Sequence, residues 1–207
     1  MSSIPRRVRP DAADDGPSQA SPELTVRLVR LARSPQGVEE DHRFEQFFYD
    51  EATTDRIMRF AARYERPLFL CNPSLAARAE KAGMDYLLLD RDPRWGERLP
   101  KHRFRRFELS QPRQARFDYD AVFCDPPFAN VALADLRKVV DLLAATPEQA
   151  AAPLWLAFVS DREEAVLEAF DGYQLERKPP ALGYRSVKEK TQERIFLYGP
   201  KFSSSSS

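Results

Sequence analysis

The chain has 207 residues, of which 43% are hydrophobic, and its 32 basic and 32 acidic side chains give a formal net charge of zero. Zero net charge argues against binding to nucleic acid through long-range electrostatic attraction alone. Only seven glycines occur, and no two lie within ten residues of each other, which excludes the G-x-G-x-x-G dinucleotide loop and the Walker phosphate loop.

The apolar runs and the cysteine and histidine counts also predict the location and the partners of the protein. The longest apolar runs have about eight residues, whereas a helix that spans a membrane needs roughly 20. Two cysteines and two histidines are too few for a zinc cluster or a disulfide framework. No apolar leader follows the first residues. We therefore expect a cytoplasmic, monomeric protein with reduced thiols and with no metal or membrane partner.

The two ends of the chain differ in composition from its middle. Residues 1–22 are rich in Pro, Ser, Ala and charged residues and show no apolar period, which predicts a disordered tail. Residues 201–207 form a serine tail that we also expect to be disordered. The intervening residues, 23–200, are predicted to form one domain.

The first half of this domain alternates short apolar runs with helical periodicity. In chain order it predicts a short strand over 24–31, a helix that begins at Thr53 or Thr54 and ends at Pro67, a buried strand over 68–71, a helix from Ser74 to Gly83 and a buried strand over 86–89. Threonine and serine are favoured N-caps, and glycine favours the left-handed conformation that ends many helices.

The second half continues the alternation and ends in a strand pair. In chain order it predicts a more exposed strand over 102–109, a buried strand over 121–124, a helix capped by Asn130, a strand over 153–160, a helix opened by a capping box of Ser160 and Glu163, and two strands over 172–176 and 193–198. Apolar strands that alternate with helices predict an α/β fold with helices on both faces of a mostly parallel, seven-stranded sheet. This order is similar to the Rossmann-like class I S-adenosylmethionine-dependent methyltransferases.

In open parallel sheets, ligands bind beyond the carboxyl ends of the strands. The polar segments that directly follow the predicted strands are Asn72–Ser74, Asp90–Asp92, Glu108, Asp125–Phe128 and Ser160. Asp90 and Asp92 come about 20 residues after the first buried strand, the spacing at which a carboxylate binds ribose hydroxyls, although an ordinary turn before Pro93 is equally compatible. Asn72, Pro73 and Ser74 take the place of a glycine loop, and the helix that follows could face a carboxylate.

The sequence Asp125-Pro126-Pro127-Phe128 resembles the [DNS]-P-P-[YFW] signature of methyltransferases that use S-adenosylmethionine to modify amino nitrogens. Asp125 and the carbonyl of Pro126 can accept the N–H groups of the acceptor, while Pro127 helps to stiffen the loop. Phe128 can stack on a base or pack along an aliphatic amine. The alternative is a turn that simply ends a strand.

Four segments together carry a resemblance to the N6-adenine methyltransferase-like family. They are FEQFFYDEAT (44–53), LFLCNPSLA (68–76), LLLDRDPRW (87–95) and VFCDPPF (122–128). The chain resembles the family from about residue 43 to residue 199, most closely the branch that methylates a lysine of elongation factor 1-alpha. The resemblance implies S-adenosylmethionine as cofactor, in a site shaped by the loop over 125–128 and by Phe47, Phe48, Tyr49, Asp50, Asn72, Pro73, Ser74 and Asp90. The spacing described above adds Asp92 to the expected cofactor-binding residues.

The resemblance and the motif together predict an N-methyltransferase with a macromolecular acceptor. The family that this chain resembles also includes a ribosomal RNA adenine methyltransferase with zinc-binding modules. A protein lysine is favoured over nucleic acid because the resemblance is closest to the lysine branch, the net charge is zero and those zinc-binding modules are missing. The exocyclic amine of adenine in RNA or DNA stays an alternative, as does a non-catalytic binding domain of the same fold. The basic run over 98–106 fits a charged edge strand better than a phosphate contact.

Overall fold

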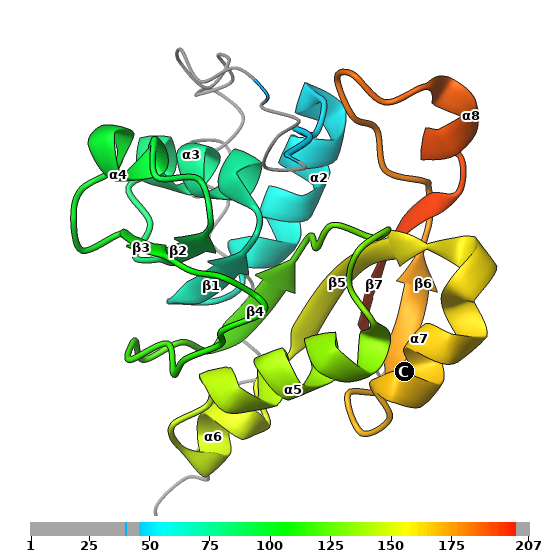
Figure 1. The fold of residues 1–207 in the computed structure, drawn as a ribbon. Coiled ribbons are helices and arrows are strands. Elements are labelled where there is room, and N and C mark those ends of the chain that lie inside the picture. The colour runs from blue at the N-terminus through cyan, green and yellow to red at the C-terminus, as the bar shows by residue number, and fades with distance from the viewer. Residues whose placement is uncertain (1–39, 41–45, 202–207) are drawn as a thin grey trace, which may run out of the picture.

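The computed structural model describes residue 40 and residues 46–201. The predicted tail over 1–22, the predicted strand over 24–31 and the serine tail beyond Lys201 lie outside the described residues. Seven strands form one sheet in the order β3-β2-β1-β4-β5-β7-β6 (Figure 1). Strands β1 to β5 pair in parallel, and β7 runs antiparallel to both β5 and β6. The predicted α/β fold with a mostly parallel seven-stranded sheet is confirmed.

Helices cover both faces of this sheet (Figure 1). The strands are β1 Pro67–Leu70, β2 Leu87–Asp90, β3 Phe104–Arg106, β4 Ala121–Cys124, β5 Leu154–Val159, β6 Leu175–Lys178 and β7 Ile195–Pro200. The helices are α2 Glu51–Ala61, α3 Pro73–Ala82, α4 Trp95–Arg98, α5 Leu133–Leu143, α6 Pro147–Ala150, α7 Glu163–Ala169 and α8 Glu189–Gln192. A 3₁₀ turn, η2, spans Ser160–Arg162. None of the described helices is long and apolar enough to cross a membrane.

Two hydrophobic clusters lie on opposite faces of the sheet. Phe69, Phe123 and Trp155, from neighbouring strands, pack with α2 and α3, and the Phe123 and Trp155 rings stack with centroids 5.7 Å apart. Alternate residues of the same strands, such as Leu68 and Val122, pack with α5 and α7. Side chains of a strand point alternately to the two faces, so a sheet covered on both sides requires strands that are apolar throughout.

The first two described helices begin at different residues from those predicted. The side chain of Asp50, rather than Thr53 or Thr54, caps α2 by accepting a 2.7 Å hydrogen bond from Thr53 N. Asn72, rather than Ser74, caps α3. In both helices the capping side chain accepts a hydrogen bond from the main-chain N–H three residues later. The predicted caps, Thr53, Thr54 and Ser74, already lie inside the first turn of their helices and so cannot take the cap position. The helix α2 also ends at Ala61, well before Pro67, which instead opens β1.

Two later caps also differ from the prediction. Helix α5 begins at Leu133, so Asn130 lies before it and Ala132 takes the cap position. Ser160 and Glu163 form no capping box, because the backbone of Ser160 pairs with Arg194 O where β5 and β7 meet. The carboxylate of Glu163 instead accepts a 3.0 Å hydrogen bond from the Tyr198 hydroxyl. The apolar period Leu136, Val139, Val140 and Leu143 also predicts a buried face for α5, and these residues are buried.

The outer strands and the cysteines test the predicted strand order. The basic run contributes β3, which lies at one edge of the sheet as predicted, and β6 forms the other edge. Cys124 is buried and lies opposite Leu70, so Cys71 follows on the neighbouring strand end. The order of the strands also predicts that the two cysteines lie close together and buried; they do lie on neighbouring strand ends, although Cys71 is partly exposed.

Candidate active site

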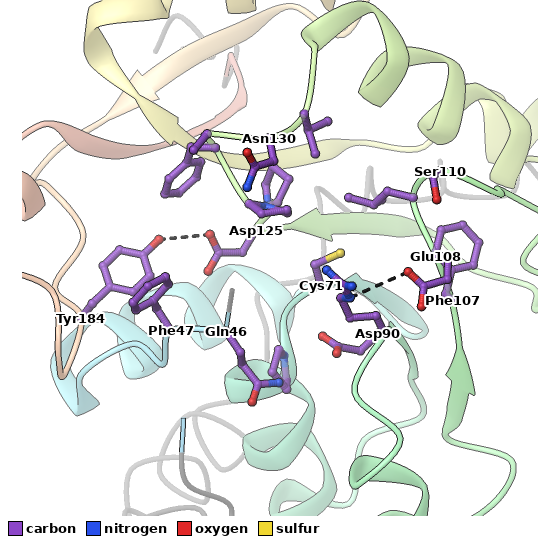
Figure 2. A pocket seen from close by; sticks show the side chains of 18 residues that line it. Gln46, Phe47, Cys71, Asp90, Phe107, Glu108, Ser110, Asp125, Asn130 and Tyr184 are labelled. Atoms are coloured by element: carbon purple, nitrogen blue, oxygen red, sulfur yellow. Dashed lines mark hydrogen bonds and ion pairs between the residues drawn. The ribbon is translucent and has the colours of Figure 1, made fainter. Parts of the chain in front are cut away.

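A cavity of about 570 Å³ opens at the carboxyl ends of the central strands (Figure 2). Its walls include the last residue of β2, residues that follow β1, β3 and β4, and one residue from the segment between β6 and β7: Asp90, Pro73, Glu108, Asp125, Phe128 and Tyr184. Its volume lies within the range of about 300–1,000 Å³ that is typical of small-molecule sites. The position is the one at which open parallel sheets bind their ligands.

Acidic and aromatic side chains together give the cavity its chemical character. The rings of Phe47, Phe107 and Phe128 contribute to its walls, together with several prolines. Its charged lining residues are three carboxylates, of Asp90, Glu108 and Asp125, against the single guanidinium of Arg91, which lies 3.8 Å from Glu108. An apolar enclosure with excess negative charge favours a ligand that carries positive charge.

Asp125 follows β4 and lies beside the cavity. Its main-chain N–H donates to Leu70 O at 3.1 Å, which fixes the start of the double-proline turn against the end of β1. The Tyr184 hydroxyl donates to Asp125 Oδ1 at 3.0 Å (Figure 2). Burial raises the pKa of Asp125 to about 7, even though hydrogen bonding with Tyr49 and Tyr184 lowers it. Asp125 can therefore act as a hydrogen-bond acceptor that changes its charge near neutral pH.

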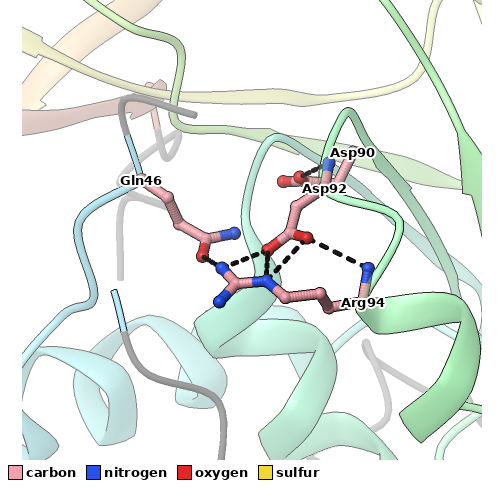
Figure 3. Close-up of polar contacts among 4 residues, drawn as sticks. All are labelled: Gln46, Asp90, Asp92 and Arg94. Carbon is pink, nitrogen blue, oxygen red and sulfur yellow. Dashed lines mark hydrogen bonds and ion pairs between the residues drawn. The ribbon is translucent and has the colours of Figure 1, made fainter. Parts of the chain in front are cut away.

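Asp90 is the last residue of β2 and the second buried carboxylate of the cavity. Its Oδ1 accepts a 2.9 Å hydrogen bond from Asp92 N, which shapes the turn after the strand (Figure 3). Burial raises the pKa of Asp90 to about 7, while the hydrogen bond from Asp92 N lowers it. A buried carboxylate of this kind gains stability from further N–H or O–H donors, such as those of a polar ligand.

Asp92 has a different environment, although it lies only two residues further along. Its side chain is fully buried and does not line the cavity. Arg94 holds it with both Nε, at 2.9 Å from Oδ1, and Nη2, at 2.7 Å from Oδ2 (Figure 3). The amide of Gln46, in the orientation that satisfies both of its polar atoms, donates to Asp92 Oδ2 at 3.3 Å and accepts from Trp95 Nε1 at 3.0 Å. These contacts give Asp92 a structural role in the turn, and its predicted contact with a cofactor stays a prediction.

The substitution Asp92→Asn should lower stability more than ligand affinity. It removes the charge of a buried ion pair, and because Arg94 is 36% exposed, water screens the loss to about 1–3 kcal/mol of unfolding free energy. Urea denaturation would measure this, with Asp141→Asn as control because that residue pairs with Arg137 on the surface. An Asp92→Asn protein of unchanged stability would contradict the structural role.

The segment Phe47–Asp50, called the aromatic segment below, is hydrogen-bonded to the turn after β1 beside the cavity. Phe48 and Tyr49 are buried, and Asp50 caps α2. Tyr49 N donates to Ser74 Oγ at 3.3 Å, and Asn72 Nδ2 donates to the Tyr49 hydroxyl at 3.4 Å. The two segments, predicted separately from the sequence, are thus hydrogen-bonded to each other.

The structure separates the predicted site residues into two groups. Those that line the cavity are Pro73, Asp90, Asp125, Pro126, Pro127 and Phe128. Those that lie outside its lining are Phe48, Tyr49, Asp50, Asn72, Ser74 and Asp92. Tyr184 lines the cavity and was not predicted, because nothing in the local sequence indicates that the segment between β6 and β7 returns to Asp125. Within residues 40 and 46–201, no three His, Cys, Asp or Glu side chains gather as a metal site would require.

Two comparisons of the sequence with known proteins bear on the family of this chain. A family model described as "Probable N6-adenine methyltransferase" matches residues 40–182. No protein of curated function matches the sequence.

Solved structures show the same fold at low sequence identity. A mutein of the branched-chain polyamine synthase of Thermus thermophilus, crystallised with N4-aminopropylspermidine and 5'-methylthioadenosine, has a TM-score of 0.59 at 15% identity, covering 85% of this chain and 62% of that one. The methyltransferase domain of a bacterial Hen1 has a TM-score of 0.50 at 10% identity, covering 72% of this chain and 97% of the domain. This chain thus spans less than two thirds of the polyamine synthase, and both likenesses concern the fold alone.

Proposed function

This chain belongs to the N6-adenine methyltransferase family, and we propose that it methylates an amino nitrogen. We further propose a protein lysine as acceptor, on the acidic and aromatic lining of the cavity rather than on the family membership. It is an enzyme, an S-adenosylmethionine-dependent methyltransferase. The observation that carries the proposal is the acidic, aromatic cavity in which Asp125 lies beside Phe128. The specific branch that methylates elongation factor 1-alpha stays a prediction.

The residues of the cavity fit the cofactor. When bound, S-adenosylmethionine supplies an electrophilic methyl group on a positively charged sulfonium. Asp90, at the end of β2 and 5% exposed, would accept hydrogen bonds from the ribose hydroxyls. Pro73 lies at the first turn of α3, where the positive end of the helix dipole favours a carboxylate. The cofactor has no phosphate, which agrees with a cavity whose lining contains no glycine.

A lysine side chain suits the part of the cavity around Asp125. Its alkyl stem can pack on Phe128, and the three carboxylates attract its positively charged end. The amine attacks only when neutral, and its ordinary pKa of about 10.4 must fall for this to occur near pH 7. Desolvation in the cavity lowers the pKa of an amine, whereas neighbouring carboxylates raise it, so the ammonium must first lose its proton to solvent. Asp125 and the Pro126 carbonyl would then accept the N–H groups of the neutral amine.

A second candidate acceptor is the exocyclic amine of adenine. The description of the family favours it, and a flat base could stack on Phe128 in the place of an alkyl chain. The acidic lining disfavours a phosphate inside the cavity, so only the base would enter.

The acceptor can be identified by transferring labelled methyl groups from S-adenosylmethionine into a cell extract. We expect the label to be removed by protease and retained after nuclease, and the methylated residue to be lysine on mass spectrometry. Label that nuclease removes would establish adenine in place of lysine. If repeated, freshly purified preparations of this protein transfer no label to the extract, the assignment of a macromolecular amine as acceptor is contradicted.

The pH dependence of kcat/KM separates the two acceptors. The raised pKa values of Asp90 and Asp125, both about 7, mean that both carboxylates gain protons as the pH falls below 7, so kcat/KM should drop there for either acceptor. Above pH 7, a lysine acceptor should give about a tenfold rise for each pH unit as its amine loses a proton. The exocyclic amine of adenine is already uncharged in this pH range and has no ammonium proton to lose. A plateau of kcat/KM above pH 8 would therefore contradict lysine.

A further inference from the structure

The segment between β6 and β7 returns across the end of the sheet and pairs with the aromatic segment. Tyr49 and Tyr184 form an antiparallel bridge, flanked by hydrogen bonds from Asp50 N to Gly183 O at 3.0 Å and from Arg185 N to Phe48 O at 2.9 Å. The rings of Tyr49 and Tyr184 lie 4.9 Å apart between centroids. Two parts of the chain more than 130 residues apart therefore form one wall beside the cavity.

Gly183 allows this pairing because the two backbones approach closely. A Cβ atom at this position would lie 2.0 Å from Asp50 Oδ2, which is a steric clash. Gly183 N also donates to Thr53 Oγ1 at 2.8 Å, in the first turn of α2. The position of the segment is thus fixed on the side that faces α2.

Gln192 also fixes the position of this segment. It is the last residue of α8, and its Oε1 accepts from Tyr184 N at 3.1 Å while its Nε2 donates to Tyr184 O at 2.8 Å. A side-chain amide that bonds both main-chain groups of one residue holds that residue as a neighbouring strand would. The side chain of Tyr184 projects from this clamp to Asp125, where its hydroxyl donates at 3.0 Å.

We infer that Tyr184 is a positioning residue for Asp125 and that Gln192 sets the place of Tyr184. The inference rests on the proposed function, in which Asp125 accepts an N–H of the acceptor. The Tyr184 hydroxyl holds Oδ1 of the carboxylate, which Tyr49 also faces, so the orientation in which Asp125 meets the acceptor is restrained. The hydrogen bond also stabilises the charged carboxylate, which is the form that accepts hydrogen bonds from the N–H groups of the acceptor.

The hydrogen bond can be tested without any acceptor. Carbon-13 NMR of aspartate-labelled protein, with the Asp125 signal assigned through Asp125→Asn, would follow its titration in the wild type and in Tyr184→Phe. Loss of a donor to the charged form should raise the pKa of Asp125 by about one unit. Tyr198→Phe is the matched control, because it removes the hydroxyl of another buried tyrosine that donates to a carboxylate, that of Glu163, outside the cavity.

Kinetics test whether the position of Asp125 matters for methyl transfer. Tyr184→Phe should lower kcat by roughly tenfold or more, leave the KM for S-adenosylmethionine within about threefold, and move the acidic limb of kcat/KM to higher pH. Gln192→Ala should produce the same changes to a smaller extent, and Tyr198→Phe should produce none.

The outcomes separate the inference from the proposed function. An Asp125 titration that is the same in Tyr184→Phe and in the wild type would overturn the inference, whatever the acceptor. A raised pKa together with an unchanged kcat and pH profile would overturn it as well, because Tyr184 would then touch Asp125 without positioning it for transfer. If the wild type methylated no amine but the titration moved as expected, the proposed function would fail while the contact stood.

Discussion

Asp125→Ala should lower the kcat for methyl transfer about 10²–10³-fold, since it removes a preorganised acceptor from the place where charge changes during the reaction. Methyl incorporation under single-turnover conditions would measure the loss. Cofactor affinity should stay within about threefold of the wild type, because Asp90, rather than Asp125, lies at the strand end where a carboxylate binds ribose hydroxyls. The effect therefore belongs to the transfer step.

Asp125→Asn provides the matched comparison. Its amide oxygen can still accept from the Tyr184 hydroxyl and from the acceptor, but it carries no charge. We expect this variant to retain more activity than Asp125→Ala and to lose most of the acidic limb contributed by Asp125. An alanine variant with activity equal to that of the wild type would contradict the role of Asp125 in methyl transfer.

Asp90→Ala should weaken the binding of S-adenosylmethionine by roughly 30–1,000-fold. Two hydrogen bonds from ribose hydroxyls to a buried carboxylate contribute about 1.5–3 kcal/mol each, part of which water replaces in the cavity of the variant. Isothermal titration calorimetry with S-adenosylmethionine would measure the change. The loss of affinity should lower kcat/KM for the cofactor more than kcat at saturation.

The matched control for Asp90→Ala is Asp92→Asn. Asp92 is buried two residues away, and it bonds Arg94 outside the cavity. We expect this control to retain cofactor affinity within about threefold while it loses stability. If Asp92→Asn lost the affinity and Asp90→Ala kept it, the assignments of the two carboxylates would have to be exchanged.

The sequence predicted the sheet well because burial on both faces leaves a strong pattern. Leu68 to Leu70 and Ala121 to Cys124 are apolar without interruption, and only a strand covered by helices on both sides fits such short runs. The helix starts were harder to predict because several capping residues follow one another. Asp50 and Thr53 can each cap a helix, and the choice between them depends on which N–H lies within reach in the folded chain.

The site was predictable only where its residues directly follow strands. Asp90 and Asp125 line the cavity because the carboxyl ends of neighbouring parallel strands meet at one edge of the sheet. Tyr184 could not be found in this way, because it comes from an irregular segment and its partner Asp125 lies 59 residues away. Its position depends on main-chain hydrogen bonds with the aromatic segment and on Gln192, which no local pattern encodes.

The two outer strands have a consequence for the behaviour of the protein at high concentration. The edge strand β3 has three residues, two of which are Arg105 and Arg106, and the opposite edge strand β6 carries the charged residues Glu176, Arg177 and Lys178. An incoming strand from another molecule would find few unpaired peptide groups at either edge and would have to displace water from these charges. The sheet therefore resists extension by a second molecule, and amyloid-like stacking through its edges is disfavoured.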